Sequence, residues 1–265
     1  MDILAKILVF IFGLCIGSFL NVVIWRLPKD KSITGRSNCA FCGHVLSVGD
    51  LVPVLSYLGL GGKCRYCHKK ISPRYLIIEL ATGLAYLLAF TSFMPSDLVS
   101  GLLFLKVLVG ISILVSVFVI DLENFLILDS VIFFGFAVSL VLNLVLDRLS
   151  GDWGSGSLLI QGLLGALAAS LPFFLIWYFS RGRMMGFGDV KLALFMGMLL
   201  GLKGVLVGLY VGIIIGGICG VCLLLFAGKN LKTKLPFGTF LSVGAFIALF
   251  WGEKMFNWYL GLLGF

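Results

Sequence analysis

A series of apolar stretches, each long enough to cross a lipid bilayer as a helix, constrains this chain more than any other feature. A transmembrane helix needs about 20 mostly apolar residues. The sequence offers eight such stretches, at 3–25, 76–93, 98–120, 125–146, 158–179, 186–202, 205–227 and 237–263. The sixth stretch is short, and the eighth contains Glu253 and Lys254. The sequence therefore predicts an all-α polytopic membrane protein of about eight transmembrane helices.

The composition excludes the main alternatives to a membrane protein. Hydrophobic residues make up 60% of the 265 residues and charged residues 12%. A soluble domain has about 45–50% apolar residues even with glycine counted, and about 25% charged residues. These proportions exclude a soluble enzyme, a disordered chain and a disulfide-rich secreted domain. The 34 glycines suit helices that pack closely in lipid.

The basic residues predict how the chain is oriented in the membrane. Nine of them occupy the segment between the first two stretches, namely Arg26, Lys29, Lys31, Arg36, Lys63, Arg65, Lys69, Lys70 and Arg74. Alternation over eight spans places Arg181, Arg183, Lys191, Lys229, Lys232 and Lys234 on the same side, against Lys6, Arg148, Lys203 and Lys254 on the other. Cytoplasmic loops are rich in Lys and Arg. We therefore expect this segment in the cytoplasm, both termini outside, and a net charge of +8 that reflects topology rather than nucleic-acid binding.

Four of the seven cysteines lie in this basic segment with a spacing typical of a zinc site. Cys39-Ala40-Phe41-Cys42 is followed, after 21 residues, by Cys64-Arg65-Tyr66-Cys67. Two residues between thiolates allow a tight turn to direct both sulfurs at one tetrahedral ion. Four thiolates favour a structural zinc ion that serves as the core of a small domain. Two redox pairs or disulfides are the alternative, which a cytoplasmic location disfavours.

The same considerations divide the chain into three parts. Residues 1–27 are expected to form the first transmembrane helix, residues 28–75 a cytoplasmic zinc-binding loop domain, and residues 76–265 the transmembrane core.

Two carboxylates at the ends of apolar stretches are candidate catalytic groups. Asp121 ends the third stretch, and Asp189 opens the sixth within Gly186-Phe187-Gly188-Asp189. Charged groups in or beside a membrane span are costly, which makes them functional candidates. Two carboxylates from separate helices at one depth can share a proton and activate a water molecule, as in aspartyl proteases. From the residues alone, wetted helix caps remain an alternative, and Asp129 and Glu123 are rival carboxylates.

Further motifs run through the whole chain. They are Gly17-Ser18-Phe19-Leu20-Asn21, Arg26-Leu27-Pro28, both cysteine pairs, Asp50-Leu51-Val52-Pro53, Ile71-Ser72-Pro73-Arg74-Tyr75 with Glu79, Ile120-Asp121-Leu122-Glu123, Gly186-Phe187-Gly188-Asp189-Val190-Lys191-Leu192 and Pro236-Phe237-Gly238. In this order the motifs resemble the bacterial prepilin peptidases, or type IV leader peptidases, of the GxGD class of membrane aspartyl proteases.

The resemblance implies a function, a site and two cofactors. It implies that Asp121 and Asp189 are the catalytic pair and that Cys39, Cys42, Cys64 and Cys67 bind a structural Zn²⁺. The substrate would be a type IV prepilin or pseudopilin, whose short basic leader is cut at the cytoplasmic face of the bacterial inner membrane. The complete cysteine loop implies a second activity, which methylates the new N-terminal residue with S-adenosylmethionine.

Three alternatives to this function are open at this point. The chain can cleave without methylating, or it can be a zinc-bearing membrane assembly factor without chemistry. A transporter with an ion relay predicts acidic residues near mid-span, whereas here they gather at span ends.

No nucleotide-binding fingerprint locates a cofactor site, so the cofactor-binding residues are left unassigned. Four polar residues of the motifs either line that site or hold the loop to the membrane core, and the structural role is favoured; they are Asn21, Asp50, Arg74 and Glu79. Glycines at 197 and 201, and at 208, 212, 216 and 220, are expected to serve packing within the bundle. The alternative for these glycines is a dimer face, which would make the chain a homo-oligomer.

Overall fold

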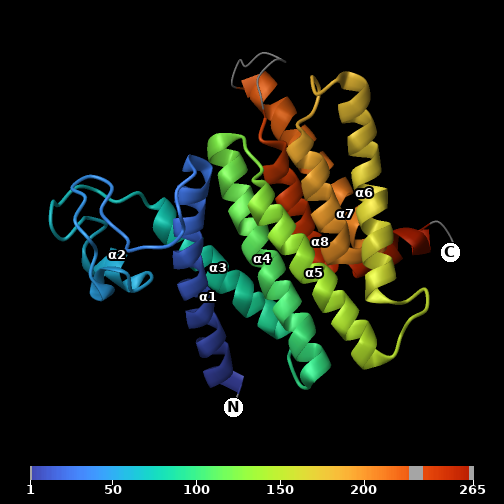
Figure 1. Cartoon of the computed structure of the whole chain (residues 1–265), viewed down its shortest axis with the longest axis horizontal. Helices are drawn as coiled ribbons and strands as arrows, with labels where there is room; N and C mark the ends of the chain where they lie inside the picture. Colours follow the sequence, from blue (N-terminus) through green and yellow to red (C-terminus); the bar gives the residue numbers. More distant parts are fainter. Residues whose placement is uncertain (1, 227–234, 263–265) are drawn as a thin grey trace. The chain divides into compact units, whose positions relative to one another are not determined.

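A computed structural model describes residues 2–226 and 235–262 of the chain, and in these ranges it contains helices and loops without a β-strand. The chain divides into two compact units, Met1–Met94 and Pro95–Phe265. Among the described residues, seven helices are long and apolar enough to cross a membrane. These findings confirm the prediction of an all-α, multi-pass membrane protein (Figure 1).

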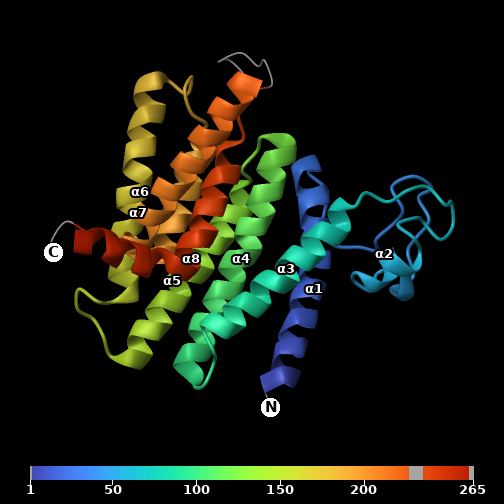
Figure 2. The same cartoon turned by 180° about the vertical axis from the view of Figure 1, so that it is seen from behind.

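The first unit pairs two long helices and carries the cysteine loop between them. Helix α1 (Asp2–Arg26) and helix α3 (Arg74–Ser92) lie side by side (Figure 2). The loop contains two short 3₁₀-helices, η1 (Leu27–Lys29) and η2 (Val48–Asp50), and the short α-helix α2 (Leu55–Gly59). Glycines bring the two helices together, because a Cβ at Gly17 would lie 2.7 Å from the Cα of Glu79. Near the loop, Asn21 Nδ2 donates a hydrogen bond to the Tyr75 carbonyl at 3.1 Å.

The second unit is a bundle of five helices, α4 (Leu98–Asn124), α5 (Asp129–Ser150), α6 (Leu158–Ser180), α7 (Phe187–Phe226) and α8 (Phe237–Leu262). Helix α4 begins with a capping box between Asp97 and Ser100. Asp147 near the end of α5 accepts hydrogen bonds from the Ser157 hydroxyl and the Leu158 N–H at 2.6 and 2.9 Å. This carboxylate therefore fixes the start of α6 against the end of α5.

Helix α7 is interrupted at Gly201, whose φ of 73° and ψ of 177° are not helical. At about 1.5 Å per residue, 40 helical residues would extend about 60 Å, twice the thickness of a bilayer core of about 30 Å. Before the break, Gly197 packs against the backbone of Gly165 in α6; after it, Gly212 packs against Leu241 in α8. Both α6 and α8 run antiparallel to the half of α7 that they contact. The chain thus reverses direction at Gly201, and the two halves of α7 correspond to the spans predicted at 186–202 and 205–227.

The observed helices refine the predicted spans. The fourth span was predicted to begin at 125, but α5 begins at Asp129 because Phe125 takes a left-handed conformation that ends α4. Helix α8 continues through Glu253 and Lys254. The glycines at 197, 208, 212 and 216 contact neighbouring helices within the bundle, in agreement with the packing interpretation. Lys229, Lys232 and Lys234, which contribute to the predicted topology, lie outside the described residues.

Candidate functional site

Asp121 lies on the last turn of α4, and its carboxylate is held by the start of α8. Its side chain is buried, with the residue only 5% exposed. Oδ2 of Asp121 accepts hydrogen bonds from the Thr239 N–H at 2.7 Å and from the Thr239 hydroxyl at 3.2 Å. These two donors fix one carboxylate oxygen and thereby set the orientation of the Asp121 side chain.

Asp189 lies on the first turn of α7 and faces the same region. Its residue is partly exposed, and its carboxylate lies within electrostatic range of the Asp121 carboxylate. Two aromatic contacts show that the helix ends around it meet: Trp177 of α6 lies 4.8 Å from Phe187 of α7, and Phe173 lies 5.9 Å from Phe237 of α8, measured between ring centroids. The ends of α4 and α6 and the starts of α7 and α8 thus gather at one end of the second unit, which we call the aspartate end.

Ile127 explains why two of the motifs at the aspartate end contain glycine. A Cβ built on Gly188 would lie 2.9 Å from Ile127 Cβ, and one built on Gly238 would lie 2.8 Å from Ile127 Cδ1. Such separations are too short for two carbon atoms, so a side chain at either position would displace Ile127 or the helix that carries the glycine. The two glycines therefore allow Asp189 and Thr239 to approach the loop that follows Asp121.

The rival carboxylates are placed differently. Both oxygens of Asp129 accept hydrogen bonds from Lys191 Nζ, at 2.6 and 2.7 Å, and the Asp129 side chain is 58% exposed. Glu123 is exposed on the last turn of α4. Asp129 is thus neutralised by a lysine, whereas the Asp121 and Asp189 carboxylates interact with each other.

The four predicted metal ligands meet in the loop of the first unit. The Sγ atoms of Cys39, Cys42, Cys64 and Cys67 all lie within 4.8 Å of one another, and all four thiols are free. The Sγ atoms of Cys39 and Cys67 are 3.8 Å apart. A tetrahedral ion with sulfur ligands at about 2.3 Å requires sulfur atoms about 3.8 Å apart. The cluster therefore has the donor set and the spacing to hold a metal ion.

The two cysteine pairs are built on the same turn. The N–H of Cys39 donates to the His44 carbonyl at 2.9 Å, and the N–H of Cys64 donates to the Lys69 carbonyl at 3.0 Å. The N–H of Gly43 donates back to the Cys39 carbonyl, and the N–H of His68 donates back to the Cys64 carbonyl, both at 2.9 Å. Gly43 and His68 both have a positive φ, of 69° and 56°. We call these segments, 39–44 and 64–69, the two knuckles.

Each knuckle also contacts the other through equivalent positions. Lys69 Nζ lies 5.2 Å from the centre of the Phe41 ring, and the His44 ring lies 3.6 Å from the Tyr66 ring. Phe41 and Tyr66 occupy the same place in the two Cys-x-x-Cys pairs, as do His44 and Lys69 at the ends of the knuckles. The knuckles are therefore related by an approximate two-fold axis, with the four sulfurs between them.

The surroundings of Cys39 favour a thiolate. Desolvation of the Cys39 thiol opposes ionisation, but the backbone N–H groups of Cys42 and Phe41 donate toward its sulfur, and together these effects lower its pKa to about 6. At Cys67 the balance is reversed: the Lys69 N–H lowers the pKa, but desolvation and hydrogen bonds with the other three thiols raise it to about 11. Cys39 is therefore the thiol of these two that ionises first, and the thiolate is the form that binds metals.

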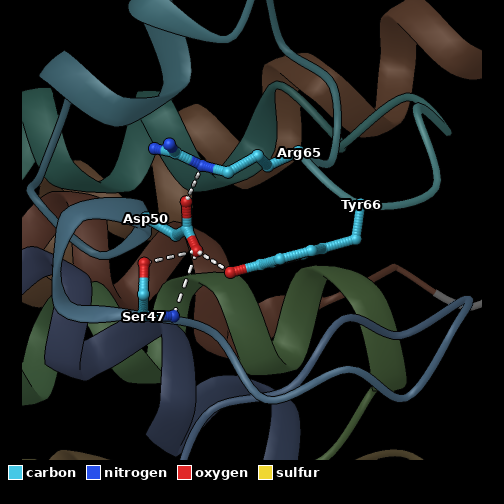
Figure 3. Close-up of polar contacts among 4 residues, drawn as sticks. All are labelled: Ser47, Asp50, Arg65 and Tyr66. Carbon is cyan, nitrogen blue, oxygen red and sulfur yellow. Dashed lines mark hydrogen bonds and ion pairs between the residues drawn. The ribbon is translucent and has the colours of Figure 1, made fainter.

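Asp50 ties the turn before α2 to the second knuckle (Figure 3). Its carboxylate accepts hydrogen bonds from the Ser47 hydroxyl at 2.8 Å, the Ser47 N–H at 3.0 Å, Arg65 Nε at 2.6 Å and the Tyr66 hydroxyl at 3.1 Å. The Ser47 hydroxyl is the main cause that lowers the pKa of Asp50 to about 2; desolvation opposes it, and the Ser47 N–H, Arg65 and Tyr66 add to it. Of the polar residues singled out from the motifs, Asp50 therefore holds the loop together.

Sequence reasoning missed Thr239, the donor to Asp121. The signal for it was its position directly after Pro236-Phe237-Gly238, a motif that opens a helix. It also missed the buried Lys106 of α4, which is attracted by the charge of Asp147 near the end of α5. In the sequence Lys106 is a single charge within the apolar stretch 98–120, and the carboxylate that attracts it lies 41 residues further along the chain.

Together, these features define a multi-pass helical membrane protein with two interacting aspartates at one end of a bundle and a four-cysteine loop. The chain belongs to the type IV leader peptidase family, whose model matches residues 108–221, and the Bacterial Peptidase A24 N-terminal domain matches residues 11–93.

Three relatives show how far this similarity extends. The chain is 32% identical to the prepilin leader peptidase/N-methyltransferase of Aeromonas hydrophila, over 96% of this chain and 93% of that protein. It is 31% identical to the protein of the same name from Legionella pneumophila, over 95% and 93% of the two chains. It is 33% identical to that of Myxococcus xanthus, over 85% of this chain and 65% of the relative. No solved structure matches the chain.

Proposed function

We propose that this protein cleaves the leader peptide of a type IV prepilin or pseudopilin with Asp121 and Asp189 as its catalytic pair, and then methylates the new N-terminal amine. The observation that carries the proposal is the meeting of two interacting carboxylates from separate helices at the aspartate end. Both residues fall within the part of the chain that matches the type IV leader peptidase family. The relatives are named for both activities.

Two neighbouring carboxylates can cleave a peptide bond with one water molecule and one shared proton. The ionised carboxylate takes a proton from the water as its oxygen attacks the scissile carbonyl, while the protonated carboxyl polarises the carbonyl oxygen. The tetrahedral intermediate then collapses as the leaving nitrogen accepts a proton, which gives a new carboxyl end and a new amine. The proton is shared by the pair, so the two carboxylates titrate as a unit.

The neighbours of the pair support this chemistry. Thr239 holds one oxygen of Asp121, which reduces the freedom of the carboxylate before substrate binds. Gly186 leaves space beside Asp189, because a Cβ there would meet no atom closer than Asp189 Oδ2 at 3.7 Å, so a substrate backbone can approach closely. Exposed apolar side chains lie nearby in the sequence, including Phe125 and Phe187, and suit a substrate whose leader is followed by an apolar helix.

The metal proposed for the four-cysteine loop is a structural Zn²⁺. Four thiolates form a soft donor set that suits zinc, and four protein ligands leave no open position for a substrate. The ion would serve as the core of a loop that has few buried apolar side chains of its own. S-adenosylmethionine is the proposed methyl donor, because it supplies an electrophilic methyl group to an amine.

The proposed location is the bacterial inner membrane, with the loop and the aspartate end in the cytoplasm. The basic segment at 26–74 supports this orientation, as do Arg181, Arg183 and Lys191, which lie near Asp189 in the sequence.

The test is cleavage of a co-expressed prepilin by the wild type and by the variants Asp121→Asn and Asp189→Asn. Asn is nearly isosteric with Asp and cannot share the proton, so both variants should insert normally and leave the pilin uncut. Asp129→Asn is the matched control, because it removes a carboxylate near the aspartate end that is paired with Lys191. It should keep most of the activity. The products are read as a gel shift and as the mass of the new N-terminal peptide, where an added methylene shows methylation.

Retained cleavage by either Asn variant at wild-type expression would remove that residue from the mechanism. Loss of cleavage in Asp129→Asn together with the other two would show that the assay reports general damage to this end of the bundle. A pilin that is cut but carries no methyl group would leave the peptidase proposal standing and refute the methyltransferase part.

A further inference from the structure

The geometry points to a cavity in the first unit as the binding site of the methyl donor, with Asn21 and Glu79 as its polar anchors. This inference rests on the proposed methyltransferase function and names the residues that perform it. The cavity has a volume of about 720 Å³ and lies between α1, α3 and the cysteine loop. Sites for small molecules and cofactors have volumes of about 300–1,000 Å³, and S-adenosylmethionine falls in the size class that such sites enclose.

Asn21 is one of the lining residues of the cavity, and it carries a buried hydrogen-bond acceptor without a partner. The residue is only 3% exposed. Its Nδ2 donates to the carbonyls of Gly17 at 3.3 Å and Tyr75 at 3.1 Å, so the amide cannot be turned over without bringing its oxygen against two carbonyls. Its Oδ1 is buried and has no hydrogen-bond partner. Buried polar atoms are nearly always paired, so this oxygen is an exception that a bound group or a bound water molecule reaching it would explain.

Glu79 supplies a negative charge in the same wall. The residue is 8% exposed, and its Oε2 accepts a hydrogen bond from the Val54 N–H at 2.8 Å. Within residues 2–226 and 235–262, this is the single hydrogen bond to the carboxylate, and no ion pair is formed with it. A carboxylate with so little exposure favours a cationic partner. S-adenosylmethionine carries two positive groups, the sulfonium and the ammonium.

Backbone strain supports a functional role for Glu79. Val54, which donates to Glu79, has φ 63° and ψ −53°, and the Leu55 N–H donates to the Pro53 carbonyl at 2.6 Å. These are the features of a γ-turn with positive φ, which is rare and strained, and more so for a β-branched residue. Strain of this kind persists where the surrounding structure enforces it, and it clusters at ligand sites.

The remaining wall suits the rest of the ligand. Trp25, Tyr57 and Tyr75 line the cavity, and aromatic rings can stack on adenine. Basic side chains lie over two of these rings, Lys29 and Lys31 over Trp25 and Arg74 over Tyr75. Cys39 and Cys64 also line the cavity, so the metal centre forms part of the wall. Arg26, Arg65 and Lys70 also line the cavity, and their positive charges suit the carboxylate of S-adenosylmethionine.

The transfer itself is balanced without a further reactant. The lone pair of the neutral amine forms the new bond to the methyl carbon, the carbon–sulfur bond breaks with its electron pair left on sulfur, and the amine nitrogen gives up one proton. The roles assigned here are binding ones: Asn21 accepts a hydrogen bond from the donor molecule, and Glu79 faces its positive charge.

The first experiment measures binding of radiolabelled S-adenosylmethionine to the purified full-length protein by equilibrium dialysis, without any pilin. We expect Glu79→Gln to raise the Kd at least about tenfold, because a hydrogen-bonded charge is lost while the acceptor for Val54 remains. Asp30→Asn is the matched control. It removes one exposed carboxylate in the same unit, outside the cavity, at a left-handed position that Asn tolerates. Its Kd should equal that of the wild type.

The second experiment locates the bound molecule directly. Ultraviolet crosslinking of the radiolabelled compound, followed by mass spectrometry of the peptides, should label segments within 18–79 that contain Trp25, Tyr57 or Tyr75. The inference would be overturned by labelling confined to residues 95–265. It would also be overturned if Glu79→Gln bound the compound as tightly as Asp30→Asn does, or if the wild type bound none. Because binding and cleavage are measured separately, loss of the site assignment is distinguished from loss of the peptidase function.

Discussion

The two knuckles carry different residues at their left-handed backbone position, a glycine in one and a histidine in the other. This difference provides a matched pair of substitutions with opposite expected effects on loop stability. Gly43 and His68 occupy equivalent places, both with positive φ. A side chain in the left-handed conformation costs about 1–2 kcal/mol, and glycine loses about 0.5–1 kcal/mol more conformational freedom on folding than alanine. A Cβ at Gly43 would meet no atom within 4 Å, so no clash adds to the balance. Gly43→Ala should therefore destabilise the folded loop by about 1 kcal/mol.

His68→Gly should have the opposite sign. The His68 side chain makes no hydrogen bond or ring contact with the rest of the described chain, so little is lost with it. Removing the left-handed side chain should stabilise the loop by up to about 1 kcal/mol. Since metal binding and loop folding are coupled, each change should appear in the apparent metal Kd, as about a fivefold weakening for Gly43→Ala and up to a fivefold tightening for His68→Gly.

The assay is competition for Zn²⁺ between the purified full-length protein and a chromogenic chelator of known affinity. Gly59→Ala is the control, because it adds the same methyl group in α2, where φ is not positive and a Cβ meets no neighbour. Its Kd should not weaken and should tighten by up to about fivefold, because alanine at a φ that is not positive stabilises the folded loop by up to about 1 kcal/mol. The argument from backbone conformation would be refuted if Gly43→Ala bound Zn²⁺ with the same Kd as the wild type. It would also be refuted if the Kd values of Gly43→Ala and His68→Gly shifted in the same direction.

Three further predictions concern other parts of the structure. Gly188→Ala should lower the cleavage rate at least about tenfold in the prepilin assay, because its Cβ would lie 2.9 Å from Ile127 Cβ, and the second change Ile127→Ala should restore part of the rate. Asp50 has its pKa lowered from 3.8 to about 2, so its contribution to loop stability is complete above about pH 4 and is lost as the pH falls through about 2. Limited proteolysis with pepsin should thus find the loop of Asp50→Asn weaker than the wild type at pH 4, with the difference gone near pH 2. Asp147→Ala should lower stability by about 1–3 kcal/mol in thermal unfolding in detergent, because it leaves the Ser157 hydroxyl and the Leu158 and Leu159 N–H groups without their acceptor. Lys106→Met should cost less, because three hydrogen bonds still hold the Asp147 carboxylate.

Features that depend on neighbours in the sequence could be predicted. Apolar runs of about 20 residues identify membrane helices with little regard to the rest of the chain. The two cysteine pairs identify a metal centre for the same reason, since each pair forms its own turn. The end of α4 could not be located in this way. Residues 125–128 are Phe-Leu-Ile-Leu, as apolar as any span, and the helix stops there because Phe125 takes a left-handed conformation.

Features that depend on contacts between distant segments could not be read from the sequence. Thr239 donates to Asp121 across 118 residues, and Ile127 lies against glycines that precede Asp189 and Thr239. The sequence does contain one sign of these contacts, namely the glycines that leave room for them. At Gly17, Gly188 and Gly238, all within motifs, a Cβ would come within 3 Å of a neighbouring atom. These three motif glycines therefore mark close approaches of two segments, and the structure is needed to say which segment makes each approach and which side chain it brings to the site.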